Sequence, residues 1–200
     1  MEMEILELGL LHTNCYLIWD DKTHDGVILD PGDQANKIME RLGRLDFSVR
    51  GIVLTHRHFD HVGAVAQLRE AYGCPVYAPA GDVDLPAELS GEPIPNALLY
   101  QDGDVLSFGS VTLHALCTPG HTPGSSCLRV GNWLFSGDTL FRGSCGRTDF
   151  PGGDWREMYR SLKRLGCLEG NLFVYPGHGE ATTLEQERKN NPYLQEAMRR

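Results

Sequence analysis

Short runs of apolar residues, separated by polar turns, dominate the chain and predict strands. In the first half these runs are Met3–Leu8, Cys15–Trp19, Val27–Leu29, Val49–Leu54 and Val76–Tyr77. In the second half they are Val105–Phe108, Val111–Leu116, Ser126–Val130, Asn132–Phe135 and Leu172–Tyr175. The two halves are therefore similar in pattern, and each predicts a sheet.

Apolar residues three or four positions apart predict helices between these strands. This spacing occurs in Gln34–Leu45, Val62–Tyr72, Trp155–Leu165 and Leu184–Met198, the last interrupted at Pro192. Prolines and glycines break the pattern over 78–95, which predicts a loop with at most short helical turns. Strands in both halves with helices between them predict an α+β fold. We expect two sheets face to face with helices outside, in one domain over residues 1–200.

Composition narrows the class of protein. The chain has 200 residues, 41% of them hydrophobic and 22% charged, which is typical of a folded domain rather than a disordered one. It has no apolar run of about 18 residues, so we expect no membrane span. The acidic start lacks the features of a secretory signal, which favours the cytoplasm. A net charge of −9 argues against nucleic acid as a partner.

The chain contains six cysteines, and no two of them form a C-x-x-C pair. A zinc ribbon or a thioredoxin-type site is therefore not indicated. For a cytoplasmic protein we expect reduced thiols that pack as small apolar side chains. We make the same prediction for Cys145, although it lies in a loop rich in glycine and arginine.

The segment Thr55-His-Arg-His-Phe-Asp-His61 carries the clearest chemistry. Imidazole and carboxylate are the ligands that zinc, iron and manganese take from proteins. In extended backbone the side chains of His56, His58 and Asp60 share one face, whereas His61 needs a turn to point elsewhere. One loop could thus serve two ions. An alternative is that Asp60 only caps the helix that follows.

Further candidate ligands follow other predicted strands. They are His121, Asp138 and His178, each in a glycine-containing loop directly after an apolar run. In layered folds such loops converge at one edge of a sheet, so we expect these groups to meet the first cluster. His12, His24 and His114 do not share this context, and we assign them no chemistry.

The order and spacing of these residues resemble the metallo-β-lactamase-fold hydrolases over nearly the whole chain. Within that fold the chain is similar to glyoxalase II-like hydrolases, including their short bacterial form. The similarity lies in Asp30-Pro-Gly32, in the stretch Gly137–Asp154 and in Glu187-Arg-Lys-Asn-Asn-Pro-Tyr193. The resemblance implies a four-layer αββα sandwich with a two-metal site.

The resemblance also implies a role for each ligand. His56, His58 and His121 would hold one divalent ion, and Asp60, His61 and His178 the other, with Asp138 bridging them. We expect zinc, with iron or manganese as alternatives. Asp30 is either a turn residue or, as we favour, a residue that holds the loop of residues 55–61 through backbone hydrogen bonds. We call this loop the metal loop.

A small-molecule thioester of the S-lactoylglutathione type is the expected substrate. A bridging hydroxide would attack its carbonyl carbon, with Asp60 orienting the nucleophile or accepting its proton. The sequence offers no evident general acid, which favours a thiolate leaving group, whose parent thiol has a pKa of about 8.5. Arg147 matches the residue of the family that contacts the glutathione carboxylate. It could instead form a buried ion pair with an acid such as Asp149, which stands where the family has tyrosine.

Three alternatives differ in chemistry. The Gly-Arg-Thr-Asp-Phe stretch also resembles persulfide dioxygenases, in which His56, His121 and Asp138 would hold a single iron. The fold also permits a β-lactam hydrolase, although the expected cytoplasmic location argues against one. A non-catalytic metal-binding module would close its coordination with four ligands, and seven candidates argue against it.

Overall fold

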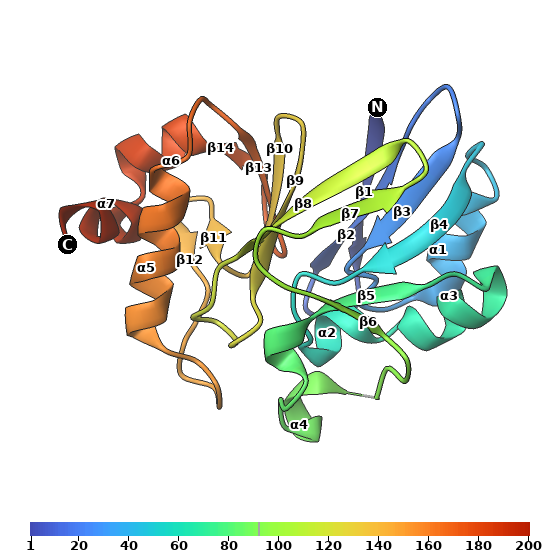
Figure 1. The fold of residues 1–200 in the computed structure, drawn as a ribbon, viewed down its shortest axis with the longest axis horizontal. Helices are drawn as coiled ribbons and strands as arrows, with labels where there is room; N and C mark the ends of the chain where they lie inside the picture. Colours follow the sequence, from blue (N-terminus) through green and yellow to red (C-terminus); the bar gives the residue numbers. More distant parts are fainter. Residues whose placement is uncertain (92) are drawn as a thin grey trace.

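Two sheets form the centre of the computed structural model, which describes residues 1–91 and 93–200 (Figure 1). In spatial order the first contains β1 (Glu2–Leu8), β2 (Thr13–Trp19), β3 (Asp25–Leu29), β4 (Ser48–Val53), β5 (Val76–Pro79) and β6 (Leu98–Tyr100). The second contains β14 (Thr182–Thr183), β13 (Phe173–Pro176), β10 (Trp133–Gly137), β9 (Ser126–Val130), β8 (Val111–Cys117) and β7 (Val105–Phe108). A separate small hairpin pairs β11 (Leu140–Phe141) with β12 (Ser144–Cys145).

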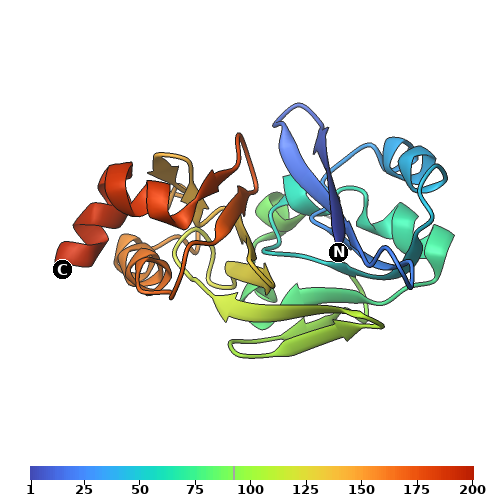
Figure 2. The same ribbon diagram turned by 90° about the horizontal axis from the view of Figure 1, so that it is seen from above.

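Helices cover the outer faces of both sheets. The first sheet is covered by α1 (Ala35–Leu42) and α3 (Val65–Tyr72), and the second by α5 (Trp155–Gly166), α6 (Leu184–Asn190) and α7 (Pro192–Arg199). Figure 2 shows the orange and red C-terminal helices on the opposite side of the molecule from α1 and α3. The short elements α2 (Phe59–Val62), the 3₁₀ turn η1 (Ala80–Asp82) and α4 (Ala87–Ser90) belong to connecting segments. No helix among the described residues is long and apolar enough to cross a bilayer.

Three apolar clusters separate the four layers. The first lies between the first sheet and its helices, where Ile28 and Ile52 pack with Ile38 and Leu68. The second lies between the two sheets and includes Tyr16, Val53, Phe108, Leu113 and Phe135. The third lies between the second sheet and its helices and includes Leu134, Val174, Met158, Leu162 and Leu194. Each fully buried large side chain contributes about 1.5–3 kcal/mol, so every layer is held by its own core. The predicted αββα sandwich is confirmed.

The prediction of one helix over Val62–Tyr72 is wrong. The structure contains α2 and α3 with a break at Gly63 and Ala64. The break arises from a tertiary contact: a Cβ at Gly63 would lie 2.3 Å from the Gly32 carbonyl oxygen, and the Ala64 amide donates to Pro31 at 3.0 Å. The segment that precedes α1, which contains Pro31 and Gly32, thus packs directly against the end of α2.

The prediction that Pro192 interrupts the last helix is confirmed, because α6 ends before it and α7 begins with it. Asn191 caps α7, its side chain accepting hydrogen bonds from the amides of Tyr193 and Leu194. The patterns did not predict β6, β14 or the β11–β12 hairpin, which are only two or three residues long.

Strand direction brings the candidate ligands to one edge. Strands β3, β4 and β5 run parallel, and so do β10 and β13. Strand β8 runs in the same direction as β10, because β9 is antiparallel to both. The loops that follow β3, β4, β8, β10 and β13 therefore emerge together, as expected for side chains at the carboxyl ends of parallel strands.

Candidate metal centre

All seven predicted ligands lie together at this edge. They form three overlapping groups whose ligand atoms lie within 4.8 Å of one another: His56 with His58 and His121; His56 with His61 and Asp138; and Asp60 with His61 and His178. Five of the seven come from β4's loop or β8's loop, and Asp138 and His178 come from the loops after β10 and β13. Ligands from four separate loops meet only because the two sheets stack.

Asp138 lies between the two outer groups. Its Oδ1 is 3.4 Å from Nε2 of His61, and its Oδ2 is 3.5 Å from Nε2 of both His121 and His178. On the side of His178, Asp60 Oδ2 lies 3.2 Å from the same Nε2. One carboxylate thus faces both groups, which is the geometry that a bridging ligand requires.

Three of the histidines are oriented by hydrogen bonds made on their far side. Nδ1–H of His61 donates to Asp30 Oδ2 (3.0 Å). Nδ1–H of His121 donates to the Arg147 carbonyl oxygen (2.7 Å), and Nδ1–H of His178 donates to the Leu11 carbonyl oxygen (3.0 Å). A carbonyl or carboxylate oxygen accepts only, so each ring must carry its proton on Nδ1. The Nε2 lone pairs then point to the centre, as in metal sites whose ligands are held from behind.

Asp30 holds the metal loop as predicted. Its carboxylate accepts from the Thr55 amide and the Thr55 hydroxyl, both at 2.7 Å, in addition to His61. The Thr55 oxygen in turn accepts from Nδ1 of His56 at 3.1 Å. Asp30 has a φ of 49°, a left-handed conformation that aspartate tolerates better than most residues. The buried Asp30 carboxylate therefore orients two of the candidate ligands, His61 directly and His56 through Thr55.

The residues present fit a bound cation. Nε2 of His56, Nε2 of His61 and Oδ1 of Asp138 are buried and have no hydrogen-bond partner. His58 differs from the other histidines, because it approaches the centre through Nδ1, which lies 2.8 Å from Nε2 of His121. Buried polar atoms without partners are costly unless an ion or water satisfies them. The imidazole and carboxylate donors suit zinc, iron or manganese.

Electrostatics gives the candidate ligands different protonation states. Burial lowers the pKa of His56 well below its usual value and that of His58 to about 4, so both rings are neutral at pH 7. Burial opposes ionisation of Asp138, but the charge of His61 and its hydrogen bond outweigh it and hold the pKa of Asp138 below its usual range. Burial lowers the pKa of His61 and His178 too, but the neighbouring carboxylates outweigh it and raise both, so a cation at these two rings must displace a proton.

Sequence analysis missed Asp82, which ties two metal loops together. This fully buried carboxylate accepts from the Gly124 amide at 2.6 Å through Oδ1. Through Oδ2 it accepts from the Arg57 amide at 2.9 Å and the Thr122 hydroxyl at 3.0 Å. Asp82 lies in the stretch interpreted as an irregular loop, and no motif around it signals this role. Its partners flank His58 and His121.

The start of β2 holds the loop of His178. The Asn14 side chain donates to the carbonyls of Pro176 (3.0 Å) and Gly179 (2.9 Å). Beside it, the Thr13 hydroxyl donates to Asp60 Oδ2 at 3.0 Å. These residues were not predicted as part of the site, because Asn14 lies 162 and 165 positions from its partners and Thr13 lies 47 positions from Asp60. Thr13 also shows that Asp60 does not serve simply as a helix cap: α2 begins at Phe59, with His58 before it.

Arg147 is exposed and already has a partner. Its guanidinium donates through Nε and Nη2 to the two carboxylate oxygens of Asp149, each at 2.7 Å. It also stacks on Phe150, 3.8 Å from the ring centroid. An ion pair with Asp149 was the alternative to a substrate contact, but the expectation that it is buried is wrong, because both side chains are exposed. Its role in substrate binding stays a prediction.

The other reactive side chains differ in burial. Five of the six cysteines are buried or half-buried, which fits the expected packing role, whereas Cys167 is exposed. Burial raises the pKa of Cys145 to about 12, which fits packing rather than nucleophilic chemistry. His12 and His24 lie on the surface, where they pair with Glu7 and Asp46, and His114 is exposed on β8.

Comparison with known proteins identifies the class. Residues 8–178 match the family model of the metallo-beta-lactamase superfamily, and the chain belongs to that family. It is 35% identical to hydroxyacylglutathione hydrolase GloC of Haemophilus influenzae, over 97% of this chain and 98% of that protein.

Two solved structures are similarly related. The BLEG-1 B3 metallo-beta-lactamase superposes with a TM-score of 0.86 at 35% identity, over 96% of this chain and 99% of that one. The protein TTHA1623, solved in a di-iron-bound form, superposes with a TM-score of 0.84 at 39% identity, over 95% of this chain and 99% of that one.

Proposed function

We propose that the protein is a two-metal hydrolase that cleaves thioesters of the S-lactoylglutathione type, as a glyoxalase II. The observation that carries the proposal is the position of Asp138, whose carboxylate lies within 3.5 Å of His121 in one group and of His61 and His178 in the other. A site for one ion needs no such shared carboxylate. The similarity to GloC supports the choice of thioester, and the di-iron form of TTHA1623 supports a centre of two ions.

The reaction adds water across the bond between carbonyl carbon and sulfur. A C–O bond forms, the C–S bond breaks, and the products are a carboxylate, a thiol and a proton. Bound divalent ions would lower the pKa of water and stabilise negative charge on the carbonyl oxygen. Asp60 is the residue placed to orient the attacking water and to accept its proton. The Thr13 hydroxyl donates a hydrogen bond of 3.0 Å to Oδ2 of Asp60 and so holds this carboxylate in place.

A thioester suits this site because its leaving group needs little help. A thiol has a pKa of about 8.5, so a thiolate can depart without first taking a proton from the protein. We propose zinc as the metal, with iron or manganese as alternatives. We propose the cytoplasm as the place of action.

Metal analysis and a substrate panel test the proposal together. We expect two ions per chain and hydrolysis of S-lactoylglutathione that is lost in Asp138→Asn and retained in Asp104→Asn, a change on a distant turn. Two ions with hydrolysis of a chromogenic β-lactam instead would favour the lactamase alternative. One iron with oxygen uptake on a persulfide would favour the dioxygenase. Two ions and background rates on every thioester would reject the proposed substrate class.

A further inference from the structure

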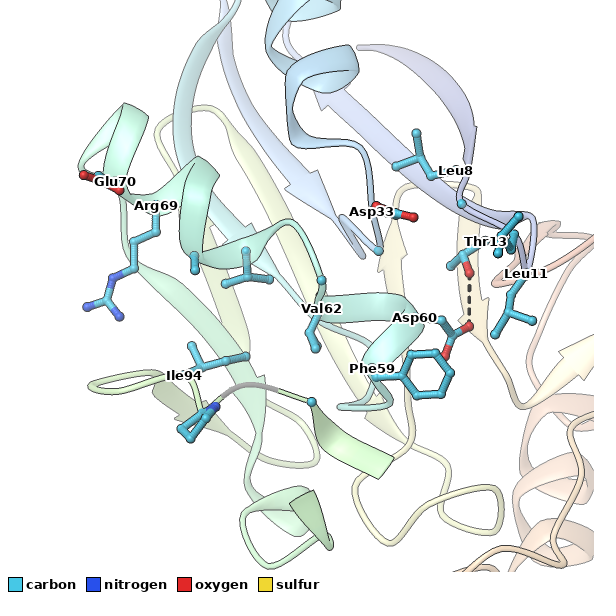
Figure 3. Close-up of a pocket in the computed structure, with 18 of the residues that line it drawn as sticks. Leu8, Leu11, Thr13, Asp33, Phe59, Asp60, Val62, Arg69, Glu70 and Ile94 are labelled. Atoms are coloured by element: carbon cyan, nitrogen blue, oxygen red, sulfur yellow. Dashed lines mark hydrogen bonds between the residues drawn. The ribbon is translucent and has the colours of Figure 1, made fainter. Parts of the chain in front are cut away.

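A cavity of about 780 Å³ opens beside the metal centre (Figure 3). Its walls come from the turn between β1 and β2, from α2 and α3, and from the segment 93–95. This volume is within the range of about 300–1,000 Å³ that is typical of small-molecule sites. We call it the acyl groove.

The acyl groove is lined mainly by hydrocarbon. Its apolar walls include Leu8, Leu11, Phe59, Val62, Val65 and Ile94. Two large apolar side chains near the centre are unusually accessible for a folded protein: Leu11 is 51% exposed and Phe59 is 49% exposed. Contiguous exposed apolar surface next to a reactive centre marks a place where an apolar ligand is removed from water.

The groove is continuous with the metal centre. Thr13 and Asp60 both line the groove, and Asp60 is also a candidate metal ligand, so the groove reaches the centre at this carboxylate. Figure 3 shows the Phe59 ring next to the Asp60 carboxylate, with Val62 and Ile94 farther along the same wall. A molecule whose carbonyl carbon lies at the centre can therefore extend one of its two arms into the groove.

Charge decides which arm that is. Among the described lining residues the basic side chain is Arg69, and its guanidinium is already bonded to the Pro95 carbonyl. Asp33 and Glu70 are acidic, and the Asp60 carboxylate is assigned to the metal centre. Glutathione carries two carboxylates, which this lining would repel and leave unpaired. An uncharged hydrocarbon meets neither penalty, so the thiol-bearing arm belongs outside the groove.

We propose that the acyl groove holds the acyl chain of the substrate, so that the enzyme prefers thioesters of apolar acyl groups longer than lactoyl. This inference rests on the proposed function. On cleavage the C–S bond breaks, the acyl chain stays in the groove as part of the carboxylate product, and the thiol departs on the open side.

A chain-length series on the metal-loaded protein tests the inference. The substrates are acyl N-acetylcysteamine thioesters from acetyl to decanoyl, because their thiol arm is small, uncharged and constant. We expect kcat/KM to rise about twofold to fourfold per methylene until the groove is full, since a fully buried methylene contributes about 0.8 kcal/mol. Decanoate should inhibit competitively, more tightly than acetate.

Two matched variants on α3 locate the effect. Ala66 lines the groove, whereas Ala71 lies outside it on the same helix, and both side chains are exposed, so neither change disturbs the core. Ala66→Phe should flatten the dependence on chain length, and Ala71→Phe should keep it.

The outcomes separate the two proposals. Hydrolysis of S-lactoylglutathione with no dependence on chain length overturns the acyl groove and leaves the proposed function standing. Absence of hydrolysis throughout the series and with S-lactoylglutathione, despite two bound ions, overturns both. A dimer in sedimentation that Ala66→Phe dissociates, together with a flat series, assigns the groove to a second copy of the chain and overturns its role in substrate binding.

Discussion

Replacing Asp82 should loosen the metal centre without touching a ligand. Its carboxylate receives three hydrogen bonds, from the Arg57 amide, the Thr122 hydroxyl and the Gly124 amide, and it is fully buried. These donors belong to the loops that carry His58 and His121. We therefore expect Asp82→Asn and Asp82→Ala to affect both folding and metal affinity.

The structure sets the magnitude. In Asp82→Asn the amide nitrogen must face either Gly124 N–H, or Arg57 N–H and the Thr122 hydroxyl; the hydroxyl can turn to accept, but a backbone N–H cannot. At least one buried amide then loses its acceptor, which costs about 1–3 kcal/mol. Removal of the buried charge offsets part of this loss, because burial already raises the pKa of Asp82. We expect a net loss of about 2 kcal/mol for Asn and about 3–5 kcal/mol for Ala.

Two measurements check this reasoning. Urea unfolding in the presence of a chelator gives the free energy of unfolding without metal, and competition with a chromophoric chelator gives zinc affinity. We expect affinity to fall about 10- to 100-fold, the usual effect of removing a group that holds metal ligands in place. The control is Asp84→Asn, an exposed carboxylate two positions away. An Asp82→Asn protein within about 0.5 kcal/mol and twofold in affinity of the wild type would refute the assigned role.

Three further predictions concern other contacts of the site. Asp149→Ala frees the Arg147 guanidinium, and the KM for S-lactoylglutathione should fall up to about fivefold, the scale of one exposed ion pair; an unchanged KM would exclude Arg147 from binding. Gly32→Ala places a Cβ 1.7 Å from the Asp60 carbonyl, so we expect fewer bound ions and a lower Tm by calorimetry, and a wild-type Tm would contradict the close packing. Glu187→Ala removes the acceptor of three hydrogen bonds, leaves the buried Thr182 hydroxyl without its partner, and should cost about 1–3 kcal/mol in urea unfolding; a loss under about 0.5 kcal/mol would show that water replaces the carboxylate.

The sequence alone predicted the fold class and the ligand set. Apolar runs of strand length, interrupted by helical spacing, reflect burial on one or two faces, and burial is a local property of each element. The ligands were predictable for a related reason. His56, His121, Asp138 and His178 each follow a strand within a few residues, and strands of one direction end at one edge of a sheet.

The tertiary structure decided the partners. The break between α2 and α3 depends on the Gly32 carbonyl, which lies about thirty positions earlier. Asp82 reaches three donors in two other loops, and Thr13 meets Asp60 across 47 positions. A hydrogen bond joins atoms that the folded chain brings within about 3 Å, whatever their separation in sequence, and periodicity carries no record of that distance. The pattern of residues therefore indicates which side chains can bind metal, whereas only the packing of the two sheets determines what holds them in place.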